Sequence, residues 1–322
     1  MRVVLIGGTG HTGTYLVPRL IEADYEVAVM SRQKKPRYEP DTLPGRAAWE
    51  RVQWIEIDRS KAEADGEFGT RVVALEPDVV IDMICYQPHS ARQLVDALRG
   101  HIQLLIHCGT IWASGPGAQV PATESDPRRP ICDYGRRKAA IEEYLLGEAR
   151  RAGFPATVLR PGHIVGQGWV PVNPAANFNP QIYSDLARGR GLALPHLGLE
   201  TLHHVHADDV AQAFMRALAN WSGAVGEAFN VTSVAALTLQ GYAEAVAGWF
   251  GRPANLTFLP WDDWKKTVSA EDASATWDHI RHSSNCSIEK ASRILGYQPR
   301  YSSLEAVKES LAWLIRNGRV QV

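Results

Sequence analysis

A tyrosine and a lysine four residues apart, Tyr134 and Lys138, are the pair in this chain best suited to acid–base chemistry. On a helix, residues four apart share one face, so the Lys138 ammonium can lie beside the Tyr134 phenol. A free tyrosine has a pKa of about 10 and transfers protons poorly at neutral pH. Lowering that pKa to about 7 takes roughly 4 kcal/mol of phenolate stabilisation, and an adjacent cation is one source of it. The alternative interpretation is a surface tyrosine and lysine on an amphipathic helix.

Three glycines with the spacing G-x-x-G-x-x-G form a second group with chemical meaning. They follow an apolar strand-like run at 3–6 and precede an amphipathic helical pattern at about 14–23. Glycine lets the backbone approach a pyrophosphate, and a helix N-terminus presents free N–H groups to it. A strand-to-helix turn without a ligand is the alternative. We expect a dinucleotide-binding loop made of Gly7, Thr9, Gly10, His11, Thr12 and Gly13.

The elements that must position these residues alternate along the first half of the chain. Strand-like runs occupy 3–6, 26–30, 52–57, 78–84, 102–107 and 156–160, and helical patterns lie at about 14–23, 68–75, 91–99 and 135–152. Such alternation is typical of a parallel sheet covered by helices on both faces. The predicted fold class is α/β, with a Rossmann-type doubly wound parallel sheet and a smaller C-terminal α/β substrate domain.

The character of the chain changes after residue 162, which indicates a domain boundary. Residues 166–200 are rich in Gly, Pro and Asn, with one helix predicted near 180–188. A strand-to-helix unit returns at 203–220, 228–231 reads as another strand, and 288–317 as helical. We expect a dinucleotide-binding domain from 1 to 165, completed by about 203–232, and a substrate domain from 166–202 and 233–322. The polar segment 34–51 is predicted as a loop over the cofactor end of the sheet.

The composition indicates a soluble protein without a large charged surface. Formal net charge is -1, from 34 basic and 35 acidic residues, which argues against nucleic acid or anionic membrane as partners. No apolar run approaches the ~20 residues of a membrane span. The four cysteines lack C-x-x-C spacing, which suits free thiols in a reducing compartment. We expect a cytoplasmic protein.

Over nearly its whole length, the chain resembles the extended short-chain dehydrogenase/reductase superfamily, in particular the NAD-dependent epimerase/dehydratase type. The resemblance implies a Rossmann domain with a small substrate domain. It also implies that Tyr134, Lys138 and a Ser or Thr move a hydride and a proton between a nicotinamide cofactor and an alcohol or carbonyl, usually on a sugar nucleotide. The segments that carry it are GGTGHTG, PDVVIDMICY, LLIHCGTIWASG, YGRRK, LRPGHIVGQG, HHVHADDVAQAF, GEAFNVTS and LGYQPRYSSLEAVKESLAWL.

The chain departs from the family pattern at three positions. The catalytic Ser/Thr falls on Cys108, whose thiol is a weak donor, so our hypothesis is that Thr110, two residues on, supplies the hydroxyl. Cys108 as a small buried strand residue is the plain alternative. His163 replaces an Asn that commonly contacts substrate. Leu202 replaces an Arg that many nucleotide-sugar members direct at the diphosphate. The other candidate cations for this contact are Arg188, Arg190 and Arg281.

The end of the second predicted strand indicates which cofactor binds. NAD-specific Rossmann proteins place an acid there, whereas this chain has Ser31 and Arg32, followed by Lys34 and Lys35. A hydroxyl and cations suit a 2′-phosphate, so NADP is our first choice and NAD the second; a solvated basic loop is the alternative. Asp58 resembles the family's adenine-side Asp or is a helix N-cap. The resemblance adds Cys85, Pro161 and His163 on the cofactor side, and Tyr86, Trp112 and His163 on the substrate side.

Two further clusters have a structural interpretation. The run from His203 to Asp209 holds metal-type ligands, but neighbouring strand residues point to opposite faces, so we predict no metal site. The two aspartates are interpreted as the N-cap and first turn of a helix from 210 to 219. The aromatic cluster of Trp249, Phe250, Phe258, Trp261, Trp264 and Trp277 is interpreted as domain core or subunit contact rather than as a stacking site.

The sequence thus predicts an NAD(P)-dependent oxidoreductase or epimerase of the extended short-chain dehydrogenase type. It would act at a secondary alcohol or ketone of a sugar or sugar derivative, free or nucleotide-linked. The alternative is a non-catalytic dinucleotide sensor or an RNA-associated protein on the same scaffold, since plastid stem-loop-binding proteins also resemble this chain. The resemblance further implies a homodimer, paired through helices 91–99 and 135–152.

Overall fold

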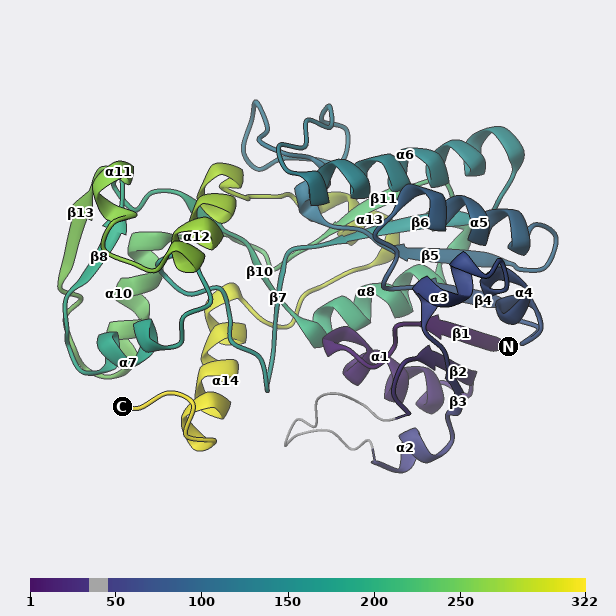
Figure 1. Ribbon diagram of the computed structural model, residues 1–322, viewed down its shortest axis with the longest axis horizontal. Coiled ribbons are helices and arrows are strands. Elements are labelled where there is room, and N and C mark those ends of the chain that lie inside the picture. The colour runs from purple at the N-terminus through teal and green to yellow at the C-terminus, as the bar shows by residue number, and fades with distance from the viewer. Residues whose placement is uncertain (35–45) are drawn as a thin grey trace.

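A seven-stranded parallel sheet forms the centre of the computed structural model, which describes residues 1–34 and 46–322 (Figure 1). The strand order is β11-β6-β5-β4-β1-β2-β3. Because β1 pairs with both β2 and β4, the order reverses there, and dinucleotides bind at such a switch point. The strands are β1 (Arg2–Ile6), β2 (Glu26–Ser31), β3 (Gln53–Glu56), β4 (Val79–Asp82), β5 (Leu104–Cys108), β6 (Ala156–Pro161) and β11 (Ala228–Val231).

Helices cover both faces of the sheet because the strands are apolar on both sides. In β1, Val3 and Leu5 pack into one core and Val4 and Ile6 into the other. The first core is closed by α1 (His11–Glu22) and α8 (Ala207–Ala219), with α9 (Trp221–Ala224) and α13 (Glu289–Leu295) beside them. The second core is closed by α4 (Phe68–Val73), α5 (Pro88–Leu98) and α6 (Asp133–Ala152), and α3 (Arg59–Ala64), which precedes them in the chain, also contributes to it. The predicted doubly wound α/β fold is confirmed.

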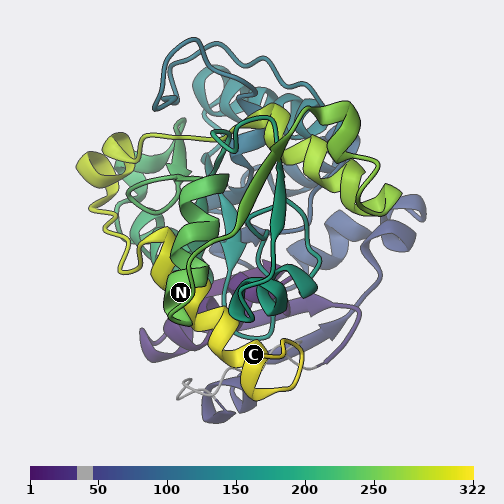
Figure 2. The same ribbon diagram turned by 90° about the vertical axis from the view of Figure 1, so that its left-hand side faces the viewer.

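The elements that build a third core lie beyond the carboxyl ends of the central strands (Figure 1) and face the viewer in Figure 2. It is built around three buried aromatic side chains, those of Tyr183, Tyr242 and Trp264. The division of the chain into two domains at the boundaries given above remains a prediction. The helices here are α7 (Gln181–Ala187), α10 (Leu239–Trp249), α11 (Trp261–Trp264), α12 (Ala270–His282) and α14 (Ser303–Arg316). The strands here are β8 (Leu192–Pro195), β9 (Thr201–Leu202), β12 (Leu237–Thr238) and β13 (Leu256–Leu259). The short pair β7 (His163–Val165) and β10 (His204–His206) packs Ile164 and Val205 against the first core instead.

Two local predictions are wrong. The predicted loop at 34–51 falls mostly outside the described residues, but its last part is the helix α2 (Arg46–Glu50). Packing explains this helix, because Ala48 is buried in the first core and Trp49 stacks on Trp54, with ring centroids 5.6 Å apart. The N-cap of α8 is His206 rather than an aspartate; its Nδ1 accepts a hydrogen bond from the Asp208 N–H.

The aromatic cluster near the C-terminal half largely packs as core. Trp264 is fully buried, and Trp249, Phe250 and Trp261 are partly buried against the third core. Trp261 stacks on Trp264, with ring centroids 5.6 Å apart. Trp277 and Phe258 are each about two-fifths exposed, at 41% and 40%. Burial of large rings is the ordinary way to stabilise so small a core.

Candidate active site

The N-terminus of α6 and the segment after β5 bring the predicted catalytic residues together. Tyr134 lies in the first turn of α6, which is capped by Cys132, whose Sγ accepts a hydrogen bond from the Gly135 N–H at 3.3 Å. The chain leaving β5 is extended at Thr110, whose side chain lies close enough to Tyr134 to influence the pKa of its phenol. The hydroxyl and the phenol therefore lie side by side at the carboxyl edge of the sheet.

The two candidates for the Ser/Thr position have different surroundings. The Thr110 hydroxyl reaches the phenol and also accepts the Trp112 N–H at 3.3 Å. Burial raises the pKa of the Cys108 thiol, so that thiol stays protonated and remains a weak donor. The contribution of Cys108 is its backbone carbonyl, which accepts a hydrogen bond from Lys138. The geometry favours Thr110 as the hydroxyl partner of Tyr134.

Lys138 occupies a deeply buried position one turn along α6. It is 2% exposed, and its Nζ donates to the Cys108 carbonyl at 2.7 Å. The ammonium also lies 4.9 Å from the centre of the Tyr86 ring, a cation–π contact. Burial lowers the pKa of Lys138, because removing an ammonium from water disfavours its charged form. The carbonyl and the ring together partly replace the lost water.

The pKa of Tyr134 differs from the sequence-based expectation. Burial raises it above the ordinary value of a tyrosine, nearby Cys108 and Tyr86 raise it further, and the Thr110 hydrogen bond opposes them. Lys138 is not among the groups that shift it most. The phenol is therefore a protonated acid rather than a phenol made acidic by the neighbouring amine.

The glycine loop has the close packing that a pyrophosphate cradle requires. Gly7 has a φ of +86°, a left-handed conformation that favours glycine. A Cβ on Gly13 would lie 1.9 Å from the carbonyl oxygen of Gly8, so helix α1 begins in direct contact with the loop. Gly10 is the N-cap of α1 and has no other atom of the described residues within 4 Å of an added Cβ. The loop thus presents an open, side-chain-free surface at a helix N-terminus.

The other predicted loop residues support this surface from behind. His11 and Thr12 are buried, at 4% and 6% exposure, and the His11 ring contacts Trp169. Thr9 is half-buried. Their side chains pack inward, so a bound pyrophosphate would be held here by backbone N–H groups.

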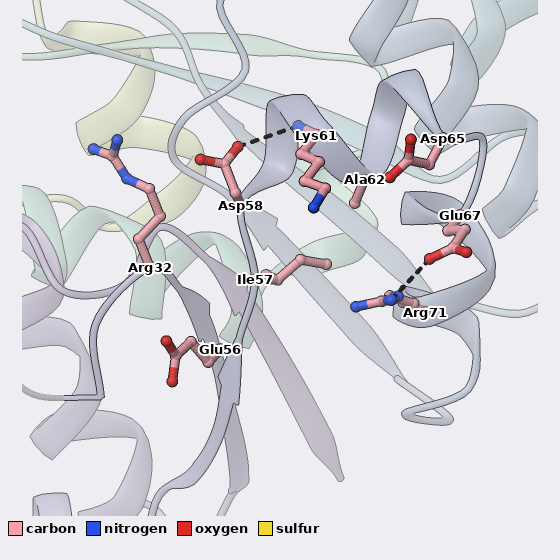
Figure 3. A pocket seen from close by; sticks show the side chains of 9 residues that line it. All are labelled: Arg32, Glu56, Ile57, Asp58, Lys61, Ala62, Asp65, Glu67 and Arg71. Carbon is pink, nitrogen blue, oxygen red and sulfur yellow. Dashed lines mark hydrogen bonds and ion pairs between the residues drawn. The ribbon is translucent and has the colours of Figure 1, made fainter.

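A cavity of about 430 Å³ opens at the ends of β2 and β3 (Figure 3). Arg32 and Asp58, both predicted on the cofactor side, line it together with Lys61. Asp58 is the N-cap of α3, accepting the Lys61 N–H at 3.2 Å, and its adenine-side role stays a prediction. Lys35 lies outside the described residues. The remaining lining residues are Glu56, Ile57, Ala62, Asp65, Glu67 and Arg71.

The side chains at the end of β2 carry no carboxylate. Ser31 donates to the Gln33 carbonyl, and Arg32 is exposed at the edge of the cavity. Lys34 lies 3.6 Å from Glu56, which pairs the acid at the end of β3 with a cation. Cys85 and Pro161, predicted on the cofactor side, are buried at the ends of β4 and β6; burial raises the pKa of the Cys85 thiol to about 12.

The predicted substrate side is a cluster of aromatic and imidazole rings. Trp112 lies between Tyr134 and His163, with ring centroids 6.2 Å from each. One face of Trp112 is covered by His282, stacked at 4.1 Å, and His279 packs 5.3 Å away. Tyr86, which is half exposed, lies 6.5 Å from Tyr134 by ring centroids.

The sequence reasoning missed His279 and His282, both on α12. Their spacing of three places them on one helix face, which is the only local indication of a shared role. Burial lowers the pKa of His279 to about 4 and also lowers that of His282, so both imidazoles are neutral at pH 7. The side of the site facing the phenol is therefore aromatic and uncharged.

Leu202, at the position of the family's diphosphate-binding arginine, is buried in β9. The three alternative cations are engaged elsewhere: Arg188 with Gln321, Arg190 with Asp185, and Arg281 with Asp278. Within residues 1–34 and 46–322, no group of three His, Cys, Asp or Glu side chains is arranged to hold a metal ion. His203 and His204 instead bond the carbonyls of Ser233 and Val172.

A glycine loop at the switch point of a doubly wound sheet, with a tyrosine–lysine pair at the same edge, defines a Rossmann-type nicotinamide-dependent enzyme. The chain belongs to the NAD dependent epimerase/dehydratase family, whose model matches residues 3–232. The predicted family, fold and enzyme class are confirmed, and the cofactor is a nicotinamide dinucleotide. None of the helices in the described parts of the chain is long and apolar enough to cross a membrane.

Curated relatives and solved structures match most of the chain. The 2'-dehydrokanamycin reductase of Streptomyces kanamyceticus is 29% identical, over 99% of this chain and 86% of that protein. The chloroplast stem-loop binding protein of 41 kDa b of Arabidopsis thaliana is 25% identical, over 96% of this chain and 78% of that protein. UDP-glucose 4-epimerase of Thermotoga maritima, solved with UDP-glucose, superposes with a TM-score of 0.72 at 22% identity, covering 98% and 99% of the two chains.

Proposed function

We propose that this protein is an NADP-dependent reductase or dehydrogenase acting at a secondary alcohol or ketone of a sugar or sugar derivative. The observation that carries the proposal is the Tyr134 phenol, close to the Thr110 hydroxyl and one helical turn from a buried Lys138, at the same sheet edge as the glycine loop. Both the tight contact of Gly13 on Gly8 and the open Gly10 fit a bound pyrophosphate.

In the reductive direction each residue has a definite task. The bound nicotinamide dinucleotide would supply the hydride. Tyr134, kept protonated by burial, donates its proton to the oxygen of the substrate carbonyl. The Thr110 hydroxyl donates to the same oxygen and stabilises the charge that develops on it. Lys138, a buried cation held by the Cys108 carbonyl, stabilises the phenolate left behind.

The preference for NADP rests on the end of β2. In the described residues there, Ser31 and Arg32 stand where an NAD-specific protein needs an acid for the ribose 2′-hydroxyl. Arg32 is exposed at the cavity and suits a phosphate dianion, whereas Glu56 is already paired with Lys34. An NADP preference also favours net oxidation or reduction over epimerisation, since an epimerase regenerates its own cofactor. We expect NADP to bind at least tenfold more tightly than NAD; tighter NAD binding would refute this.

The substrate class is inferred from the ring cluster and the relatives. A reductase of a kanamycin derivative and several nucleotide-sugar enzymes are similar to this chain, so a sugar-like substrate is the common element. Leu202 offers no bidentate contact to a diphosphate, and Arg188, Arg190 and Arg281 have other partners. We therefore favour a sugar derivative without a nucleotide.

NADPH oxidation followed at 340 nm with a panel of keto sugars and nucleotide sugars tests the proposal. Once a substrate is found, Tyr134→Phe should lower kcat by about 10²- to 10⁴-fold with cofactor affinity unchanged. Thr110→Val should lower kcat, and Cys108→Ala should have little effect. Full turnover by Thr110→Val together with an inactive Cys108→Ala would reverse the assignment, and an active Tyr134→Phe would refute the mechanism.

An RNA-associated function is the second candidate, because the Arabidopsis relative is named for stem-loop binding. The balanced charge of this chain argues against strong contact with phosphate backbones. A salt-dependent gel shift with stem-loop RNA that survives Tyr134→Phe would favour it over catalysis.

We also infer a cytoplasmic homodimer, joined through α5 and α6, which pack side by side on one face of the sheet. Many side chains of these helices are exposed, including those of Arg92 and Arg136. Light scattering coupled to size exclusion would give twice the chain mass, and a charge reversal on α6 would give monomers. A monomeric wild-type protein would refute the dimer.

A further inference from the structure

Two neighbouring histidines, His163 and His204, each keep one ring nitrogen without a partner. They face each other in register on the parallel pair β7 and β10, and their ring centroids are 5.8 Å apart. His163 Nε2 and His204 Nδ1 are both buried, and neither has a hydrogen-bond partner among the described residues. Buried polar atoms are nearly always paired, so two unpaired ones in adjacent rings require an explanation.

The opposite nitrogen of each ring fixes its tautomer. His163 Nδ1 lies 3.1 Å from the His203 carbonyl oxygen, and His204 Nε2 lies 3.0 Å from that of Val172. A carbonyl only accepts, so the proton of each neutral ring is on the nitrogen that faces the carbonyl. The unpaired nitrogens, His163 Nε2 and His204 Nδ1, therefore present lone pairs.

Both rings remain neutral at physiological pH, which makes them acceptors only. Burial lowers the pKa of His204 to about 4 and lowers that of His163 well below its ordinary value, an effect reinforced by the neighbouring His279. Two adjacent lone pairs attract an N–H or O–H group and repel the oxygens of a carboxylate or phosphate.

The unpaired acceptors lie next to the proposed catalytic residues. The His163 ring is 6.2 Å from that of Trp112 and 5.2 Å from that of His279, and Trp112 in turn contacts Tyr134. One ring, that of Trp112, therefore separates Tyr134 from His163.

We propose that His163 and His204 form an acceptor-only subsite that selects ligands presenting an N–H or O–H donor at this position. The donor is the primary amide of the nicotinamide ring or a hydroxyl of the sugar substrate. This inference rests on the proposed function and adds to it a requirement on ligand chemistry that Tyr134 and Lys138 do not impose.

The test compares two variants, His163→Phe and His279→Phe. The first removes a ring that has an unpaired nitrogen. The second is the matched control and removes a ring whose Nδ1 bonds the Ala275 carbonyl at 2.7 Å. In His163→Phe the His203 carbonyl still accepts a hydrogen bond from the backbone N–H of residue 163, which is 2.8 Å long in the wild type. Without ligand, His163→Phe should keep or raise the wild-type Tm, whereas His279→Phe should lower it. A binding site that is strained without its ligand gives this difference; a purely structural histidine does not.

Binding measurements separate the two donor sources. The probes are NADP⁺, its analogue with a carboxylate in place of the nicotinamide carboxamide, and a panel of neutral sugars added to the NADP⁺ complex. If the amide is the donor, the wild type should bind NADP⁺ about tenfold more tightly than the acid analogue, and His163→Phe should lose that difference. If a sugar hydroxyl is the donor, both dinucleotides bind equally, and His163→Phe loses only the thermal shift caused by the sugar.

A second variant keeps the proposal testable if His163→Phe fails to fold. His163→Asn restores N–H donors, so it should bind the acid analogue or a sugar acid more tightly than the wild type does. The inference would be overturned if His163→Phe, His163→Asn and His204→Phe all bound every probe as the wild type does. Buried water would then be the partner of the two nitrogens. Failure of the wild type to bind any nicotinamide dinucleotide would instead refute the proposed function.

Discussion

Adding one methyl group at Gly13 is the most direct perturbation of the cofactor loop. A Cβ there would lie 1.9 Å from the oxygen, 2.5 Å from the carbonyl carbon and 3.0 Å from the Cα of Gly8. All three are backbone atoms, so no side-chain rotation relieves the contact. The loop and the start of α1 must separate by about 1.1 Å merely to bring the first distance to 3.0 Å.

The expected cost follows from this geometry. Overpacking a well-filled site usually costs about 1–3 kcal/mol, and we place Gly13→Ala at the upper end because only backbone can move. At about 2–4 °C per kcal/mol for a chain of this size or slightly smaller, the Tm should fall by roughly 6 °C or more. The cradle is also displaced, so NADPH affinity, followed by nucleotide fluorescence, should fall at least about 100-fold, or roughly 2.7 kcal/mol.

Gly10→Ala is the matched control in the same loop. Among the described residues, no atom outside its chain neighbours lies within 4 Å of the added Cβ, and its φ of −83° is allowed for alanine. Its Tm should stay near that of the wild type, while NADPH binding weakens because the methyl group projects over the N-terminus of α1. A Gly13→Ala protein with wild-type Tm and wild-type NADPH affinity would refute the assignment of this loop.

Three other predictions concern buried titratable groups. Burial by itself raises the pKa of Glu142, but the hydrogen bonds and charges of Arg160 and Arg128 outweigh burial and hold this pKa below its ordinary value. Its contribution to stability is therefore present above pH about 4.5 and lost as pH falls through the folded-state value. Glu142→Gln should cost about 3–5 kcal/mol in urea unfolding at pH 7, because Arg160, 2% exposed, loses its counter-charge; a cost below 1 kcal/mol would contradict this. Tyr86→Leu should lower the already reduced pKa of Lys138 further and shift the alkaline limit of NADPH binding to lower pH, while Tyr86→Phe keeps the ring and the wild-type profile. Burial lowers the pKa of His279 to about 4, so the folded state binds fewer protons than the unfolded state between pH 6.5 and 4. The stability of the folded protein should therefore fall as the pH is lowered from 6.5 to 4. In thermal melts at a series of pH values, His279→Gln should reduce the dependence of Tm on pH. An unchanged dependence would show that other groups cause it.

Much of the fold was predictable from the sequence because its strands and helices follow local periodicity. The apolar runs at 3–6 and 26–30 and the segment 228–231 are strands, and the helical patterns near 91–99 and 135–152 are α5 and α6. Each depends mainly on residues within one element. The helix at 46–50 was missed because two contacts made by tertiary packing, Ala48 in the core and Trp49 on Trp54, stabilise it.

The candidate site divides in the same way. Spacing alone placed Tyr134 and Lys138 on one helix and the glycines at a strand-to-helix turn, because both arrangements are local. Only the packed chain brought α12 against Trp112, more than 160 residues away in sequence, and so added His279 and His282 to the site. Only burial decided the protonation of Tyr134, since a pKa depends on the water and charges removed around a group, and these come from distant segments.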